Sequence, residues 1–168
     1  TAEWSRIEVA HSDGRSRLIS SVSRAPLKLV NPRAQSDRYA AVIMSGYGGG
    51  MVEGDRVRLR IDCGDNAGLY LGTQAFTRIY KCPTGQTTQQ DIEGVIGRAG
   101  CVVALPDLVV PYAGSRFCQR QTWRLEEGAL LVLADGHTAG RLRAGERFRY
   151  DSYASSIEIR TPERPLLI

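Results

Sequence analysis

Two carboxylates beside a glycine cluster are the residues of this chain whose types and spacing best suit chemistry. Glu53 and Asp55 flank Gly54, directly after the glycine-rich residues 46–50. In an extended segment, residues two apart share one face, so both carboxylates could offer oxygen ligands to a hard or borderline cation. A solvated turn, in which Asp55 accepts hydrogen bonds from nearby amides, explains the same residues. The pair is a candidate site for transient metal contacts, with the solvated turn as the alternative.

Other catalytic arrangements have little support in this sequence. Only two histidines occur, His11 and His137, and no serine stands in a Gly-x-Ser-x-Gly elbow, so a hydrolase triad is disfavoured. No Lys-Ser or Lys-Thr follows residues 46–50, and the next segment alternates like a strand, so these glycines favour a tight turn over a phosphate cradle. An enzyme that binds a small anion at residues 48–50 stays open as an alternative class.

The four cysteines do not have the spacing of a metal site. Cys63, Cys82, Cys101 and Cys118 are separated by 19, 19 and 17 residues, without a Cys-x-x-Cys pair. A zinc site normally shows closely spaced ligand pairs. The pattern indicates buried, reduced thiols of a cytoplasmic protein, and a ladder of cysteines in successive layers stays open.

Composition narrows the class of protein. A length of 168 residues suits a single domain, residues 1–168, with a real core. The net charge of +4 is mild and the basic residues are dispersed, which argues against a nucleic-acid partner. No apolar run is long enough to span a membrane, and no signal peptide is visible. Because the chain lacks an initiator Met and ends on an apolar run, we expect an incomplete piece of a longer chain.

Strand patterns dominate the chain. Residues 56–62 alternate strictly, with Val57, Leu59 and Ile61 on one face and arginines on the other. Residues 101–105 and 129–134 are continuous apolar runs typical of buried strands, and residues 94–100 are predicted to form glycine-punctuated turns. One short helix is predicted over residues 32–41.

These strands form a weak internal repeat. Each unit is a polar strand, a turn ending in glycine, an apolar strand and a polar exit, anchored at Gly68, Gly100 and Gly128 with spacings of 32 and 28 residues. One unit alone would expose apolar area, and stacking on its neighbours would bury it. The sequence therefore predicts an all-β, layered, β-helix-like (solenoid-like) stack of strands with at most one or two short helices, ahead of a two-sheet sandwich.

Polar groups fall at similar places relative to the three glycine anchors. Thr73 and Gln74 precede Thr77 and Arg78, Arg116 precedes Gln119 and Arg120, and Arg141 and Arg143 precede Glu146. In a stacked fold such groups could line one edge as a polar channel or a docking surface. Ordinary capping of the turns is the alternative.

Five stretches of this chain, in this order, resemble the family of the urease accessory protein UreD, called UreH in some bacteria. They are PLKL from Pro26, GYGGGMVEGD from Gly46, TQAFTRIY from Thr73, LPDLVVPYAGSRFCQRQ from Leu105 and GRLRAGE from Gly140. The spelling of these stretches is closer to eukaryotic than to typical bacterial members. Complete members of the family are much longer than 168 residues.

The resemblance implies a β-helix-like chaperone of urease maturation that is not an enzyme. It implies binding to apo-urease and to the helical accessory protein UreF, which recruits the GTPase UreG, in the cytoplasm. It implies no tightly bound cofactor, because nickel would be in transit through an internal tunnel. Glu53 and Asp55 then become candidate nickel contacts. The candidates for tunnel lining or partner binding are Thr73, Gln74, Arg116, Gln119, Arg141 and Glu146. A β-solenoid interaction module without a role in metal delivery is the alternative function.

Overall fold

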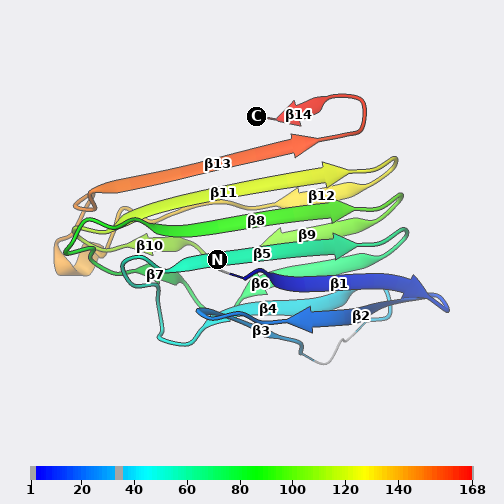
Figure 1. Ribbon diagram of the computed structural model, residues 1–168, viewed down its shortest axis with the longest axis horizontal. Helices are drawn as coiled ribbons and strands as arrows, with labels where there is room; N and C mark the ends of the chain where they lie inside the picture. The colour runs from blue at the N-terminus through cyan, green and yellow to red at the C-terminus, as the bar shows by residue number, and fades with distance from the viewer. Residues whose placement is uncertain (1–2, 33–35, 168) are drawn as a thin grey trace.

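The computed structural model describes residues 3–32 and 36–167, and within them the chain is built from β-strands (Figure 1). The strands of the first half are β1 (Ser5–Ser12), β2 (Arg15–Val22), β3 (Leu27–Val30), β4 (Ala40–Gly46), β5 (Arg56–Cys63), β6 (Gly68–Thr73) and β7 (Thr77–Ile79). The second half contains β8 (Thr88–Ile96), β9 (Cys101–Leu105), β10 (Val109–Pro111), β11 (Arg116–Leu125), β12 (Leu130–Leu133), β13 (Ser152–Arg160) and β14 (Pro165–Leu167). The helical content of the described residues is the short 3-10 turn η1 (Leu142–Ala144).

The strands wind into a solenoid of about four turns, which confirms the predicted fold class. The first sheet has the order β14-β13-β11-β8-β5-β1-β2, and the second has the order β12-β9-β6-β4-β3. Strands β5, β8, β11 and β13 pair in parallel in the first sheet, and β4, β6, β9 and β12 pair in parallel in the second (Figure 1). Strands β7 and β10 form a small third side. Parallel stacking of successive units sets this fold apart from an antiparallel sandwich.

The repeat glycines mark the turns between the first and second sheets, as predicted. Gly68 opens β6 where a side chain would collide with the Arg38 carbonyl oxygen, so the neighbouring segment requires glycine there. Gly128 has a φ of +69°, a left-handed conformation that glycine adopts without steric cost. The turns that separate each polar strand from the following apolar strand therefore require glycine at these two positions.

Gly94 differs from the prediction, because it lies inside β8 and not in a turn. A Cβ at this position would lie on the six-membered ring of Trp123, which stands on the neighbouring strand β11 in direct register with Gly94. Trp123 is fully buried. A missing side chain on one strand therefore makes room for the largest side chain on the next.

The predicted helix over residues 32–41 lies partly outside the described residues, since residues 33–35 are not described. In the described part, residues 36–39 form no helix and Ala40 begins strand β4. The four residues Ala40, Ala41, Val42 and Met44 are buried against the rest of the solenoid. Burial of apolar side chains in a parallel sheet outweighs the local helix preference of the alanines.

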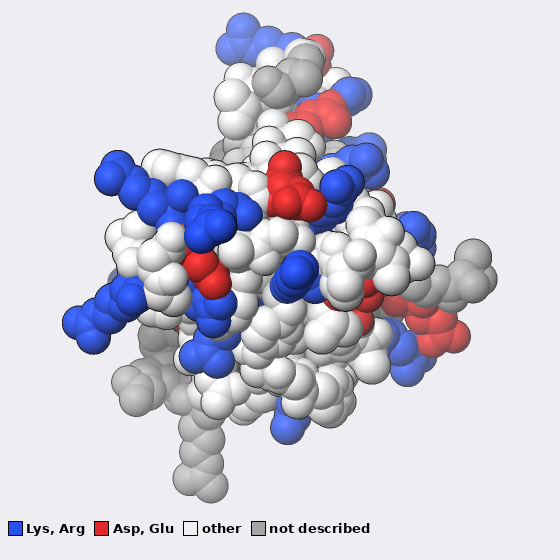
Figure 2. Space-filling model, turned by 90° about the vertical axis from the view of Figure 1, so that its left-hand side faces the viewer, with Lys and Arg blue, Asp and Glu red and all other residues white. Residues whose placement is uncertain are grey.

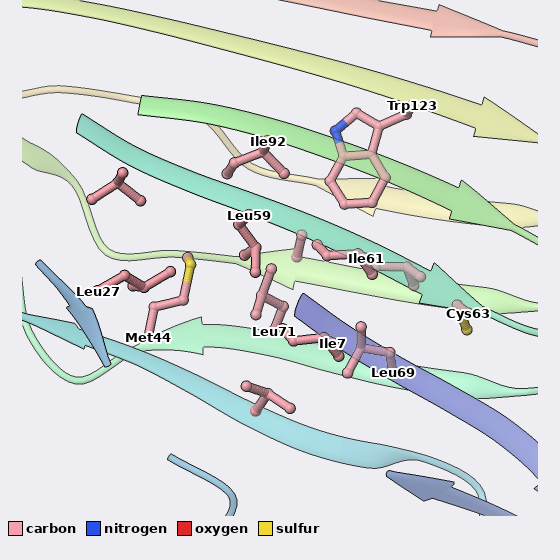
Figure 3. Packing of buried hydrophobic residues seen from close by; sticks show 14 of the residues in the cluster. Ile7, Leu27, Met44, Leu59, Ile61, Cys63, Leu69, Leu71, Ile92 and Trp123 are labelled. Atoms are coloured by element: carbon pink, nitrogen blue, oxygen red, sulfur yellow. The ribbon is translucent and has the colours of Figure 1, made fainter. Parts of the chain in front are cut away.

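The core fills the space between the first and second sheets (Figure 3). Ile7 and Leu59 point inward from the first sheet, and Leu69 and Leu71 point inward from the second. Full burial of each such side chain contributes roughly 1.5–3 kcal/mol. The inward residues alternate with outward ones along each strand, and this alternation decides which side chains reach the interior.

The arginines of β5 pair with acidic residues on the neighbouring strand. Arg58 lies in register with Asp91, and Arg60 with Glu93. The ion pairs are 3.8 Å and 2.9 Å long. The guanidinium of Arg60 also lies over the Trp4 ring, 4.4 Å from its centroid. The outer face of the first sheet is therefore a solvated ladder of opposite charges.

No helix among the described residues is long and apolar enough to cross a bilayer.

Candidate functional site

A cavity of about 370 Å³ lies between the two large sheets, towards the end of the solenoid that carries β7 and β10. Three of the predicted residues, Thr73, Gln74 and Gln119, line it. Its other polar lining residues include Ser45, Arg78, Gln90, Asp107, Gln121 and Asp135. The structure therefore brings half of the predicted tunnel or partner residues to one partly open cavity.

One wall of the cavity carries a chain of hydrogen bonds across three strands. The Gln90 amide donates to the Gln119 Oε1 over 3.1 Å. The Gln119 amide donates to the Asp135 carboxylate over 2.8 Å and to the Ser155 hydroxyl over 3.2 Å. The Ser155 hydroxyl donates to the other Asp135 oxygen over 2.6 Å. Gln119 is 3% exposed, so these bonds satisfy a buried amide that would otherwise be costly.

Strand register explains how this wall forms. Gln90, Gln119 and Ser155 are direct neighbours on β8, β11 and β13, and Val57 occupies the same position on β5. The inward position is thus apolar in one turn of the solenoid and polar in the next three. A polar stripe through the core follows from one residue choice repeated in register.

The opposite wall is formed where β6 and β9 end. The Thr73 hydroxyl donates to the Asp107 carboxylate over 3.0 Å, and the Asp107 backbone N–H donates to the Thr73 Oγ1 over 2.8 Å. The Ser45 hydroxyl donates to the Gln74 Oε1 over 2.6 Å. Thr73 thus caps the next turn and also lines the cavity, so turn capping and cavity lining, which were predicted as alternatives, occur together at this residue.

The chemistry of this cavity is that of oxygen donors. Its described lining offers the carboxylates of Asp107 and Asp135 together with amides and hydroxyls, and contains neither His nor Cys. Within the described residues, no three side chains of His, Cys, Asp or Glu gather as a metal-binding group. The oxygen atoms of such a surface are ligands that a divalent cation can contact weakly at successive points.

Glu53 and Asp55 lie in a turn outside the lining of this cavity. Glu53 Oε1 accepts hydrogen bonds from the Thr84 N–H, the Thr84 hydroxyl and the Gln86 N–H, each over 2.9 Å. Desolvation acts to raise the pKa of Glu53, but the hydrogen bonds from Gln86 and Thr84 outweigh it and lower that pKa. Asp55 accepts a 2.9 Å bond from the Val52 N–H. Both carboxylates organise the local backbone.

Two of the remaining predicted residues, Arg141 and Glu146, lie at the end of the solenoid that carries β7 and β10, beside the residues that follow these strands. Arg141 and Glu146 line a second, shallow hollow of about 590 Å³. Arg141 forms a two-point ion pair with Glu146 and lies over the Tyr112 ring, 3.9 Å from its centroid. The hydrogen bond from Arg141, and then that from the Ala113 N–H, lower the pKa of Glu146. Figure 2 shows Lys and Arg side chains spread over this end, with Asp and Glu between them.

Arg116 stands apart from both spaces. Its guanidinium pairs with Asp151 over 3.2 Å, and Asp151 lines the second hollow. The six predicted residues thus divide into three that line the cavity, Thr73, Gln74 and Gln119, and three that form ion pairs, Arg116, Arg141 and Glu146.

The glycines of residues 46–50 serve close approach of the backbone. A Cβ at Gly50 would come within 2.8 Å of the Arg78 carbonyl oxygen and of the Tyr80 ring. Met51, directly after it, forms a parallel bridge with Ile79. This close packing of the backbone agrees with the tight turn that the sequence predicted for residues 46–50.

The four cysteines are free thiols. Cys63 and Cys82 are buried, whereas Cys101 and Cys118 are partly exposed. Burial raises the pKa of the Cys63 thiol to about 12. Its Sγ lies 3.4 Å from the Ala67 carbonyl oxygen and 3.9 Å from that of Cys101.

Sequence reasoning missed Gln90, Asp107 and Asp135. A signal existed for the two aspartates, because each stands two residues after an apolar strand, β9 or β12, at the polar exit of the repeat. Gln90 could be found only by aligning β8 with β11 in register, since Gln119 is its direct partner. Register is a tertiary property that the spacing of glycines does not specify to one residue.

Comparison with known proteins places the chain in a family. Residues 3–168 match the family model described as "UreD urease accessory protein". "Urease accessory protein UreD" of Anaeromyxobacter sp. (strain Fw109-5) is 37% identical over 96% of this chain and 54% of its own length. "Urease accessory protein D" of Oryza sativa subsp. indica is 31% identical over 96% of this chain and 54% of its own length.

A fungal protein shows the same similarity. The "Uncharacterized urease accessory protein ureD-like" of Schizosaccharomyces pombe is 38% identical over 82% of this chain and 48% of its own length. The chain thus spans about half the length of the curated relatives it matches. The match across nearly all of the present residues, on a solenoid of the predicted kind, shows that this chain belongs to the UreD family of urease accessory proteins.

Proposed function

We propose that this chain acts in urease maturation, as a non-catalytic chaperone that binds apo-urease in the cytoplasm and assists nickel insertion. Its proposed partners are apo-urease, a UreF-like accessory protein and, through the complex, a UreG-like GTPase. Membership of the UreD family supports the role in urease maturation. The cavity supports the part that concerns nickel.

The observation that carries the proposal is the polar stripe at one register position of a largely apolar core. A structural core would be filled by residues such as Val57, but the equivalent positions in the following turns are Gln90 and Gln119. A buried amide such as that of Gln119 stabilises a fold less readily than an aliphatic side chain does, and the Asp135 carboxylate beside it is exposed. They do offer oxygens to a passing cation, and Ni²⁺ binds oxygen ligands less tightly than it binds imidazole or thiolate.

Passage of an ion also requires that no site holds it. Conduction needs binding that is favourable enough for entry and weak enough for exit. Asp107 and Asp135 bring the negative charge, and each already accepts hydrogen bonds from the protein. A cation at either carboxylate would compete with those bonds, which weakens its retention.

The six candidate residues then take two roles. Thr73, Gln74 and Gln119 line the proposed route, and Arg116, Arg141 and Glu146 present a charged surface for a partner. Glu53 and Asp55 are proposed as transient nickel contacts on the outside of the solenoid. A cation there would displace the N–H donors of Thr84 or Val52.

The test is urease activation in cells that lack this protein, complemented with the full-length gene or with variants. Gln119→Met keeps the length of the side chain and removes its polar atoms. We expect it to lower the nickel content and the activity of urease while the complex with urease still assembles. Thr122→Met on the exposed outer side of the same strand is the matched control and should leave activation unchanged.

Two results would contradict the proposal. Full urease activation by Gln119→Met would exclude the cavity as the route and would favour the alternative of a pure interaction module. Full activation in cells without the gene would exclude the maturation role itself.

A further inference from the structure

The inner part of the cavity between the two large sheets is apolar. Both methionines of the chain, Met44 and Met51, line it. Leu71, Ile92 and Trp123 line it from strands of the two facing sheets (Figure 3). Its volume of about 370 Å³ lies in the range of roughly 300–1,000 Å³ that is usual for small-molecule sites. Flexible thioethers also let such walls adapt to the shape of an apolar molecule.

One amide interrupts this apolar lining. Leu59, Ile92, Gln121 and Ile157 are direct neighbours across β5, β8, β11 and β13. Gln121 is therefore the polar member of an otherwise aliphatic row, and it is only 4% exposed. An aliphatic side chain at this position would stabilise the core more readily.

The orientation of the Gln121 amide follows from its neighbour. The indole N–H of Trp123 can only donate, so the atom that it contacts over 3.2 Å is the Gln121 oxygen. No described residue accepts a hydrogen bond from Gln121 Nε2, whereas Gln119 Nε2 donates to Asp135 and Ser155. Gln121 Nε2 is not sealed inside the protein and keeps accessible surface in the cavity that Gln121 lines. Its N–H donors therefore face this space without a protein acceptor.

The distribution of charge around the cavity selects the class of ligand. The charged residues of its described lining are Arg78, Asp107 and Asp135, and all three are exposed. The inner lining around Gln121 is thus uncharged, and an ionised group placed there would lose its hydration without a charged partner. A molecule that buried the Gln121 amide without accepting from it would leave the donor unpaired, which is costly.

We propose that the inner part of this cavity binds an uncharged, mostly apolar small molecule that carries one hydrogen-bond acceptor, a carbonyl oxygen or a ring nitrogen. Gln121 Nε2 donates to this acceptor, and the apolar walls enclose the rest of the molecule. The inference does not rest on the proposed function, because recognition by Gln121 needs neither urease nor nickel. Gln121 is buried and the carboxylates of the proposed nickel route are exposed, so the two sets of contacts occupy different parts of one cavity.

The experiment compares two probes of the same shape, quinoline and naphthalene, on the full-length protein at mildly alkaline pH, where quinoline is uncharged. Ligand-detected nuclear magnetic resonance measures both affinities. The indole N–H signal of Trp123, assigned with Trp123→Phe, reports binding beside Gln121. We expect quinoline to bind roughly tenfold more tightly than naphthalene, because the hydrocarbon leaves the Gln121 donor unpaired. Quinoline should also shift the Trp123 signal.

Equal affinities for the two probes would overturn the inference. So would a failure of both to saturate, which would indicate a cavity that holds water only. This comparison uses the unchanged protein and is independent of any variant.

Gln121→Met tests the assigned donor, with Thr122→Met on the exposed face as the matched control. We expect Gln121→Met to weaken quinoline binding to the level of naphthalene and to leave naphthalene binding unchanged, which also shows that the cavity is intact. Thr122→Met should alter neither affinity. A preference for quinoline that survives Gln121→Met would refute the role of this amide. Because these assays contain neither urease nor nickel, their failure would leave the maturation role to be tested by gene deletion.

Discussion

The contact between Gly94 and Trp123 gives the sharpest prediction about this fold. In Gly94→Ala the new methyl group would occupy the space of the Trp123 benzene ring. The ring is 0% exposed and its N–H donates to Gln121 Oε1 over 3.2 Å, so a shift of the ring towards the adjoining cavity, which Trp123 lines, would disturb this hydrogen bond. Forced overpacking of this kind costs about 1–3 kcal/mol of unfolding free energy.

Thermal and urea unfolding followed by far-ultraviolet circular dichroism measure this cost. For a chain of this size, a loss of about 1–3 kcal/mol lowers Tm by roughly 2–12 °C. Gly46→Ala is the matched control, because Gly46 also lies in a strand and has nothing within 4 Å of the new methyl group. The control should change stability by less than about 0.5 kcal/mol.

A double-mutant cycle tests whether the ring is the cause. Trp123→Leu removes the ring and opens the space above Gly94, so Gly94→Ala in that background should cost at least about 1 kcal/mol less than in the wild type. A Gly94→Ala protein as stable as Gly46→Ala, or strictly additive effects in the cycle, would refute the packing argument.

Three further predictions concern polar groups. Because the pKa of Glu53 is lowered in the folded protein, its carboxylate contributes its full stabilisation above the ordinary pKa of 4.5 and loses it as pH falls through the folded pKa. The difference in unfolding free energy between wild type and Glu53→Gln, measured by urea unfolding, should therefore shrink on acidification below the folded pKa. An equal difference at all pH values would contradict the role of this carboxylate in its charged form. Thr73→Val removes two hydrogen bonds between consecutive turns and should cost about 1–2 kcal/mol, whereas Thr122→Val on the exposed face should cost nothing measurable by the same assay. A double-mutant cycle on Arg60 and Glu93 should give a coupling free energy of only about 0.2–1 kcal/mol, because both side chains are half exposed. This coupling should vanish in high salt, and a coupling that persists there would contradict the exposed pair.

The class of fold could be predicted from the sequence because its signals are local. Strict alternation in residues 56–62 predicts a half-buried strand, and glycine anchors at a nearly constant spacing predict stacked units. The apolar runs at 101–105 and 129–134 correspond to β9 and β12, as predicted. The helix predicted over residues 32–41 is wrong where the structure describes these residues, since Ala40 begins the buried strand β4 and burial in the sheet overrides local propensity.

By itself, the sequence determined the all-β stack, the positions of its main turns and the residue types available for chemistry. Only the tertiary structure decided which polar residues meet. Thr73 and Gln119 are 46 positions apart in the chain and line one cavity, while Glu53 and Asp55, only two positions apart, accept hydrogen bonds from local amides outside it. The physical reason is register. In a parallel stack, a shift by one residue moves every side chain to the opposite face, so the polar stripe exists only once the strands are aligned.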